Sequence, residues 1–138
     1  MTMKAHLKWT DGLQFVARAG QGPAVILDST DGASGASPMQ LVLMGVAGCT
    51  AIDIVVILKK KRIKLSHFEI EIEGVQAQEN PKRFTHMTIT YILTGRDIKP
   101  KAVEQAIKLS ETKYCSAMAS LNAVVDHTYR IVESGNSK

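Results

Sequence analysis

Residues 37–62 read SPMQLVLMGVAGCTAIDIVVILKKKR, and this stretch decides the fold. Ser37 suits a helix N-cap, Pro38 the first helical position and Gln40 the third, which together form a capping box. The sequence then runs from 41 to 58 almost without a polar residue. The basic run at 59–62 follows, and its charge complements the C-terminal end of a helix dipole. We therefore predict one long apolar helix with Cys49 near its middle.

The apolar run of 18 residues raises the question of a membrane span, because about that length can cross a bilayer. Asp53 lies inside the run and would cost about 2.5–3.5 kcal/mol at a bilayer centre. No apolar core follows Lys4, so the first residues do not resemble a signal peptide. A helix that is apolar on all sides is expected at the centre of a compact or dimeric protein. We therefore expect a cytoplasmic protein and no membrane partner.

The segments around this helix have the alternation of β-strands. Phe68, Ile70 and Ile72 alternate with three glutamates, which predicts a strand with one apolar and one acidic face. Apolar alternation and turn signals predict three short N-terminal strands at 5–9, 13–18 and 24–27, and a strand at 84–93 after the glutamate-rich one. Two helices are predicted at 100–107 and 114–125, and a short final strand at 129–132. The order predicts a single α+β domain over residues 1–138.

Composition narrows the class of protein further. The chain has 138 residues, 45% of them apolar and 22% charged, as in a globular domain. A net charge of +4 and 5% aromatic residues fall short of a nucleic-acid surface, and the basic run near 59–64 is typical of a solvated helix end. Two cysteines without a CxxC motif exclude a disulfide scaffold or a zinc finger. The histidines have no metal-ligand spacing, so we assign no metal site; they are His6, His67, His86 and His127.

The two cysteines are the candidate reactive groups. Gly45, Cys49 and Asp53 are spaced i, i+4 and i+8, so they share one face of the long helix. Gly45 and Gly48 have no side chains, so another helix or a substrate can come close to the Cys49 thiol. Cys49 is either a nucleophilic thiol at a helix crossing or a small buried hydrophobic residue. Cys115 is either a core residue or a thiol in the first turn of a helix, where free N–H groups would favour its thiolate.

A family resemblance is carried by four segments in order. These are 37–41 leading into the Gly-Cys-Thr-Ala-Ile-Asp run at 48–53, then Arg-Phe-Thr-His at 83–86, Thr-Gly-Arg-Asp at 94–97 and Lys-Tyr-Cys-Ser at 113–116. The chain resembles the OsmC/Ohr superfamily and within it the YhfA-like branch. The resemblance implies an OsmC-like fold in an intertwined homodimer, with two long cysteine helices at its centre and two sites at the interface.

The resemblance also implies a thiol-dependent peroxidase that acts in oxidative-stress defence. Cys49 would be the peroxidatic thiol and Cys115 the resolving thiol, with an external dithiol as reductant and no bound cofactor. An apolar pocket of Met44, Ile52 and Met118 would favour organic hydroperoxides as substrates.

Two further residues bear on this reading, and a second function stays open. Gln40 stands where family members usually carry a Glu, which in the peroxidases holds an activating Arg. Arg18 lies in the strand region that supplies that Arg.

The alternative is a non-enzymatic protein of the same fold that binds a small apolar ligand at the dimer interface, with Cys49 lining the pocket.

Overall fold

The computed structural model describes residues 1–29 and 34–134 of the chain. It divides into two compact units, Met1–Val42 and Leu43–Lys138, with the division falling inside the long helix.

The first unit contains a small antiparallel sheet with the strand order β1-β2-β3. Its strands are β1 (Ala5–Asp11), β2 (Gln14–Ala19) and β3 (Ala24–Leu27), which confirms the three predicted N-terminal strands. They pair in chain order and so form an antiparallel meander. The turn between β1 and β2 contains Gly12 with a φ of 57°, a backbone conformation that glycine adopts at little cost.

The start of helix α1 (Pro38–Lys60) is capped as the sequence predicts. The backbone N–H of Ser37 donates to Oε1 of Gln40 at 2.8 Å, and the N–H of Gln40 donates to Oγ of Ser37 at 3.2 Å. This reciprocal pair is the capping box, and it satisfies backbone donors that the first turn of a helix leaves free. Lys59 and Lys60 end the helix with positive charge.

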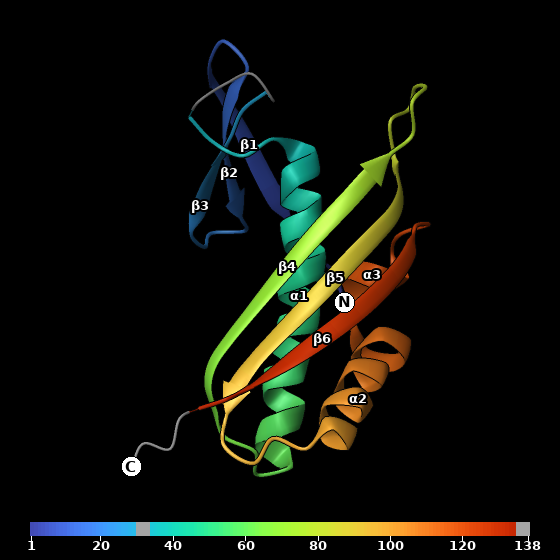
Figure 1. Cartoon of the computed structure of the whole chain (residues 1–138). Coiled ribbons are helices and arrows are strands. Elements are labelled where there is room, and N and C mark those ends of the chain that lie inside the picture. The colour runs from blue at the N-terminus through green and yellow to red at the C-terminus, as the bar shows by residue number, and fades with distance from the viewer. Residues whose placement is uncertain (30–33, 135–138) are drawn as a thin grey trace. The chain divides into compact units, whose positions relative to one another are not determined.

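The second unit is built on a three-stranded sheet with the order β4-β5-β6 (Figure 1). Strand β4 (Leu65–Gln76) pairs antiparallel with β5 (Phe84–Gly95), and β6 (Val124–Glu133) pairs parallel with β5. The parallel pairing requires a long crossover connection, which contains helix α2 (Pro100–Leu109). The glutamates of β4 are exposed and its alternating isoleucines are not, as predicted.

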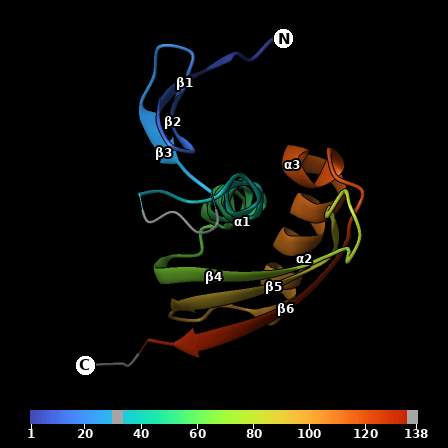
Figure 2. The same cartoon turned by 90° about the horizontal axis from the view of Figure 1, so that it is seen from above.

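The core of this unit lies between the sheet and the two helices on one of its faces (Figure 2). Strand β5 contributes every second side chain, so the sheet presents a continuous apolar surface. Helix α1 covers it with one stripe and α2 with another. The fully buried residues include Ile54, Leu58, Met87, Ile89, Tyr91, Leu93, Val103 and Ile107.

The predicted helix over 114–125 is wrong. Instead, a π-helical segment η1 (Ser110–Tyr114) is followed by a four-residue helix, α3 (Ser116–Ala119). Strand β6 then begins at Val124, and the predicted short strand at 129–132 is only its last part. The Ala-, Met- and Leu-rich composition favours a helix locally, but pairing of the valines at its end with β5 outweighs that preference.

Helix α1 is apolar on all sides, but in the single chain only one side is buried. Val46, Thr50, Ile54 and Leu58 face the core, whereas Ile52 is 67% exposed. By length and composition alone the helix could cross a membrane, a test that core helices of soluble proteins also pass. The described residues of the second unit thus leave one apolar face of the helix uncovered.

Candidate functional site: a thiol pair beside a carboxylate

The two cysteines lie together although they are far apart in the sequence. The sulfur atoms of Cys49 and Cys115 and a carboxylate oxygen of Asp53 all lie within 4.8 Å of one another. Both cysteines are free thiols; Cys49 is half-buried, and Cys115 is buried with 4% of its surface exposed. Cys49 and Asp53 come from successive turns of α1, and Cys115 comes from the crossover connection between β5 and β6. The fold thus builds one site from two separate segments.

Cys115 occupies a junction rather than the first turn of a long helix. It is the N-cap residue of α3, with extended backbone angles of φ −75° and ψ 98°. Its backbone N–H donates to the carbonyl oxygen of Ser110 at 2.7 Å, which closes the π-type turn of η1. Short π-helical turns often occur at functional sites, and this one directs the Cys115 side chain toward α1.

The environment of Cys115 favours its neutral thiol. Burial, together with the neighbouring Cys49, raises the pKa of Cys115 to about 11. Of the two readings of Cys115, this favours the core residue over a thiolate at a helix start. The physical reason is that α3 has only four residues, so its dipole is small, while the thiol lies in a buried environment that penalises charge.

Asp53 is held in place by a buried hydroxyl group. Oγ of Ser110 donates to Oδ2 of Asp53 at 2.9 Å, and it also lies 2.8 Å from Oγ1 of Thr50. Ser110 and Thr50 are both fully buried, so their mutual hydrogen bond is shielded from water, whereas the bond to Asp53 is partly buried. The carboxylate beside the thiols therefore has a fixed orientation.

The hydroxyl chain continues from Thr50 toward the surface. Oγ1 of Thr50 lies 3.0 Å from the hydroxyl of Tyr91, which donates to Oε2 of Glu111 at 3.1 Å. Nδ1 of His127 lies 3.0 Å from the other oxygen of Glu111. Burial raises the pKa of Tyr91 above its usual range, so this hydroxyl stays protonated and acts as a donor to Glu111. A connected polar path thus runs from Asp53 to the exposed His127.

A hollow of about 360 Å³ opens beside Asp53. Its other lining residues are mainly apolar, with two lysines: Val56, Ile57, Leu109, Tyr114, Lys60 and Lys61. Met44 and Ile52 of the predicted pocket are 56% and 67% exposed in the single chain, and that pocket stays a prediction about the dimer. The hollow therefore reaches the site at Asp53, and neither cysteine is among its lining residues.

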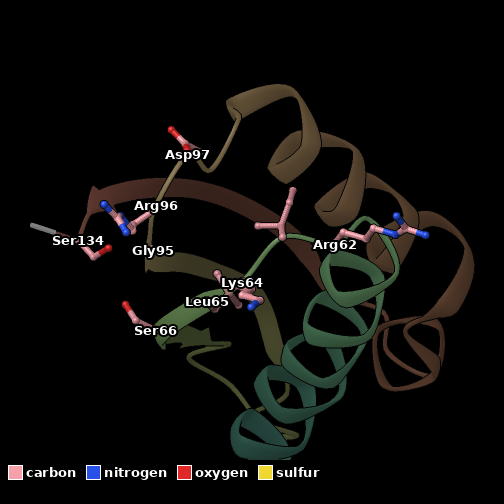
Figure 3. Close-up of a pocket in the computed structure, with 9 residues that line it drawn as sticks. Arg62, Lys64, Leu65, Ser66, Gly95, Arg96, Asp97 and Ser134 are labelled. Carbon is pink, nitrogen blue, oxygen red and sulfur yellow. The ribbon is translucent and has the colours of Figure 1, made fainter. Parts of the chain in front are cut away.

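A second hollow, of about 410 Å³, lies elsewhere on the same unit and has a basic lining (Figure 3). It lies where the turn after α1 meets the end of β5, and Arg62, Lys64 and Arg96 contribute its positive charge, with Asp97 opposing them. Figure 3 shows Arg96 close to Ser134, with Arg62 well apart from both. The basic residues are therefore spread around this hollow and do not converge on one point.

The two supporting residues predicted from the sequence belong to the first unit. The side chain of Gln40 completes the capping box, so its described role is structural. Arg18 is exposed on β2, and its Nη1 donates to the carbonyl oxygen of Gly22 at 3.1 Å. Their involvement in catalysis stays a prediction.

Several residues of the site were not singled out from the sequence as site residues. Asp53 shares a helix face with Cys49, and this i, i+4 spacing is the sequence signal that could identify Asp53 as a site residue. Ser110, Tyr91 and Glu111 had no such signal, because the crossover connection and the strand pairing bring them to α1 from distant parts of the chain.

Comparison with known proteins agrees with this architecture. The family described as OsmC-like protein matches residues 30–130. Protein YhfA of Escherichia coli K12 is 39% identical over 132 residues, which cover 94% of this chain and 98% of that protein.

Two solved structures show the fold. A hypothetical protein from Aquifex aeolicus VF5 superposes with a TM-score of 0.88 at 26% identity, covering 98% of this chain and 99% of its own. The organic hydroperoxide resistance protein OhrB of Bacillus subtilis superposes with a TM-score of 0.61 at 17% identity, covering 95% and 98%, so it shows similarity of fold alone. With its α+β architecture and cysteine-bearing helix, the chain belongs to the OsmC-like protein family.

Proposed function

We propose that this protein is a cytoplasmic, thiol-dependent peroxidase that reduces organic hydroperoxides in defence against oxidative stress. The observation that carries the proposal is the approach of the Cys49 and Cys115 sulfur atoms and the Asp53 carboxylate to within 4.8 Å. Two thiols at this separation can form a disulfide after a small movement, and a carboxylate beside them can accept a proton. The similarity to OhrB, whose name refers to organic hydroperoxide resistance, supports the same chemistry.

Cys49 is the better candidate for the attacking thiol because it is more accessible. It is half-buried, whereas Cys115 is almost fully buried and its pKa is raised to about 11. The thiolate is the nucleophile in peroxide reduction, so a buried neutral thiol is a poor first reactant. We assign to the Asp53 carboxylate the transfer of the Cys49 proton.

The reaction then proceeds in two balanced steps. The Cys49 thiolate attacks one peroxide oxygen, the O–O bond breaks, and the alcohol leaves after taking up a proton, which converts Cys49 to a sulfenic acid. The Cys115 thiol attacks the sulfenic sulfur, an S–S bond forms, and the thiol proton leaves with the sulfenic hydroxyl group as water. An external dithiol then reduces the disulfide, so no bound cofactor is needed.

A homodimer is part of the proposal. The uncovered face of α1 is apolar and contains two glycines, where a second helix can approach closely; it consists of Met44, Gly45, Gly48, Ile52, Val55 and Val56. An added Cβ at either glycine would meet no atom of the described residues within 4 Å. Packing of two such faces would bury the apolar surface that the single chain leaves in water.

The experiment is a titration of the fully reduced protein with cumene hydroperoxide, followed by free-thiol counting and intact-mass analysis. We expect one equivalent of peroxide to consume both thiols and to leave a Cys49–Cys115 disulfide. The variant Cys49→Ser should consume peroxide no faster than an alkylated control. The proposal fails if the native protein oxidises no faster than the urea-unfolded chain, because the fold would then add nothing to the reactivity of the thiols.

A second function is favoured by the apolar hollow beside Asp53. In this reading the protein binds a small apolar ligand without turnover, and Cys49 borders the binding site. Cys49→Ser separates the two functions, because ligand binding should survive this substitution while peroxide turnover should not.

A further inference from the structure

We propose that the reduced site binds one thiophilic divalent cation, such as Zn²⁺, through the sulfur atoms of Cys49 and Cys115 and a carboxylate oxygen of Asp53. These three ligand atoms, from two segments of the chain, already lie within 4.8 Å of one another. The inference goes beyond peroxide reduction and does not depend on it.

The donor set suits zinc and its neighbours rather than a hard cation. Zn²⁺ binds thiolate sulfur at about 2.3 Å and carboxylate oxygen at about 2.0–2.2 Å, usually in a tetrahedral arrangement. Two sulfurs on a tetrahedral zinc are roughly 3.8 Å apart, from the same bond length. Ligand atoms that begin within 4.8 Å therefore need only rotamer-scale movement to reach this geometry. Magnesium and calcium prefer all-oxygen sites, so two thiolates disfavour them.

The carboxylate ligand is oriented by a hydrogen bond of the kind that metal sites use. Oγ of Ser110 donates to Oδ2 of Asp53 at 2.9 Å, which leaves the other carboxylate oxygen available for a cation. Ser110 is itself fixed by Thr50, and its carbonyl oxygen holds the backbone of Cys115. Such outer contacts fix the direction of metal ligands and strengthen binding. One serine thus supports ligands on both segments.

The fourth coordination position is open to a small ligand. Asp53 lines the hollow of about 360 Å³, so water or a small anion can reach a cation held beside it. Two thiolates and one carboxylate around a divalent cation leave one net negative charge, and Lys60 and Lys61 of the same hollow partly offset it. Three protein ligands and an exchangeable fourth are the pattern of zinc sites that are not purely structural.

Binding is a proton exchange without electron transfer. The cation forms bonds to both sulfurs and to the carboxylate oxygen, and each thiol releases one proton to the solvent. A disulfide or an alkylated cysteine removes the sulfur donors, so only the reduced protein can bind.

The test uses reduced, chelator-treated protein of full length. Zn²⁺ is titrated in competition with a chromophoric chelator, and Co²⁺ is added separately to record the thiolate-to-cobalt absorption of a tetrahedral site. We expect one ion per chain, and a loss of affinity of about 100-fold or more in Cys49→Ser, Cys115→Ser and Asp53→Asn. Ser110→Ala should weaken binding by about 10- to 100-fold, the range for outer partners of metal ligands. Asp126→Asn, an exposed aspartate on β6, is the matched control and should bind as the native protein does.

Circular dichroism checks that each variant is folded, and alkylated native protein sets the level of unspecific binding. The proposal is overturned if reduced protein binds Zn²⁺ no more tightly than alkylated protein does, or if Asp53→Asn binds as tightly as the control. Peroxide turnover is measured on metal-free protein, so failure of the peroxidase proposal and failure of the metal site are separate outcomes.

Discussion

The carbonyl oxygen of Ser110 accepts the backbone N–H of Cys115 at 2.7 Å. The same serine donates its hydroxyl hydrogen to Asp53, so one buried residue links the segment of Cys115 to the helix that carries Cys49. The relative position of the two sulfurs therefore depends on Ser110 as well as on the cysteines.

Ser110→Ala should lower both stability and the efficiency of disulfide formation. The substitution keeps the carbonyl contact to Cys115 but removes the hydroxyl contacts to Asp53 and Thr50. We expect a loss of about 1–3 kcal/mol in the free energy of unfolding, the usual range when a buried partner is left unpaired. Urea denaturation measures the stability, and Ser116→Ala, at an exposed position of α3, is the matched control. An unchanged midpoint would show that water replaces the lost hydroxyl.

Cys115→Ser should separate the two steps of the proposed reaction. Without a resolving thiol, peroxide should convert Cys49 to a sulfenic acid that persists and reacts with dimedone. Intact-mass analysis should show a gain of one oxygen atom, followed by further oxidation at higher peroxide concentration. If this variant instead forms a dimer linked through Cys49, the partner's thiol resolves the intermediate.

Alkaline pH should destabilise the reduced protein. Burial raises the pKa of Cys115 to about 11 from an ordinary value of 9.0, so between these values the native chain holds a proton that the unfolded chain loses. The free energy of unfolding must then fall as the pH rises from about 9 to about 11. The raised pKa of Tyr91 extends the fall above pH 10. Cys115→Ala should flatten the first part of the fall, as measured by urea midpoints across this range; an equally steep profile would contradict burial of the thiol.

Gly48→Leu should weaken self-association without unfolding the chain. Among residues 1–29 and 34–134, no atom lies within 4 Å of a Cβ added at Gly48, and the position lies on the uncovered face of α1. A leucine there would obstruct a close helix approach, so sedimentation should show a shift from dimer to monomer. Glu71→Leu adds the same side chain at an exposed position of β4 and should leave association unchanged. A native-like dimer of Gly48→Leu would place the interface elsewhere.

Ser37→Ala should cost about 1 kcal/mol of stability, because it removes one half of the capping box. Gln40→Glu keeps an acceptor for the N–H of Ser37 and adds a negative charge in the first turn of α1. That charge should stabilise the helix by about 0.3–1 kcal/mol at low salt. Thermal denaturation of both variants measures these effects, and the gain from Gln40→Glu should diminish as salt is added.

Local sequence rules predicted the parts of the fold that depend on neighbouring residues. The capping box at Ser37, the glutamate alternation of β4 and the N-terminal meander each follow from patterns a few residues long. The end of the crossover connection does not follow from such local patterns. Residues after Tyr114 have the composition of a helix, and only the pairing of β6 with β5 shows why the chain turns extended at Val124.

The candidate site could be predicted only in part for the same reason. Cys49 and Asp53 share a helix face, so their proximity follows from spacing alone. Their meeting with Cys115 and Ser110 depends on where the crossover connection returns over the sheet. The sequence left two readings of Cys115 open, and its burial, which depends on the tertiary structure, favours the core residue.

The position of Cys115 between β5 and β6 also gives oxidation a mechanical consequence. A bond between the two sulfurs would close a covalent ring of 67 residues, from Cys49 to Cys115, that contains both long strands of the β4–β5 hairpin. Closing a loop of that length removes about 4 kcal/mol of chain entropy from the unfolded state in the entropic model. The oxidised protein would then be harder to unfold than the reduced protein, so its melting temperature would report its redox state.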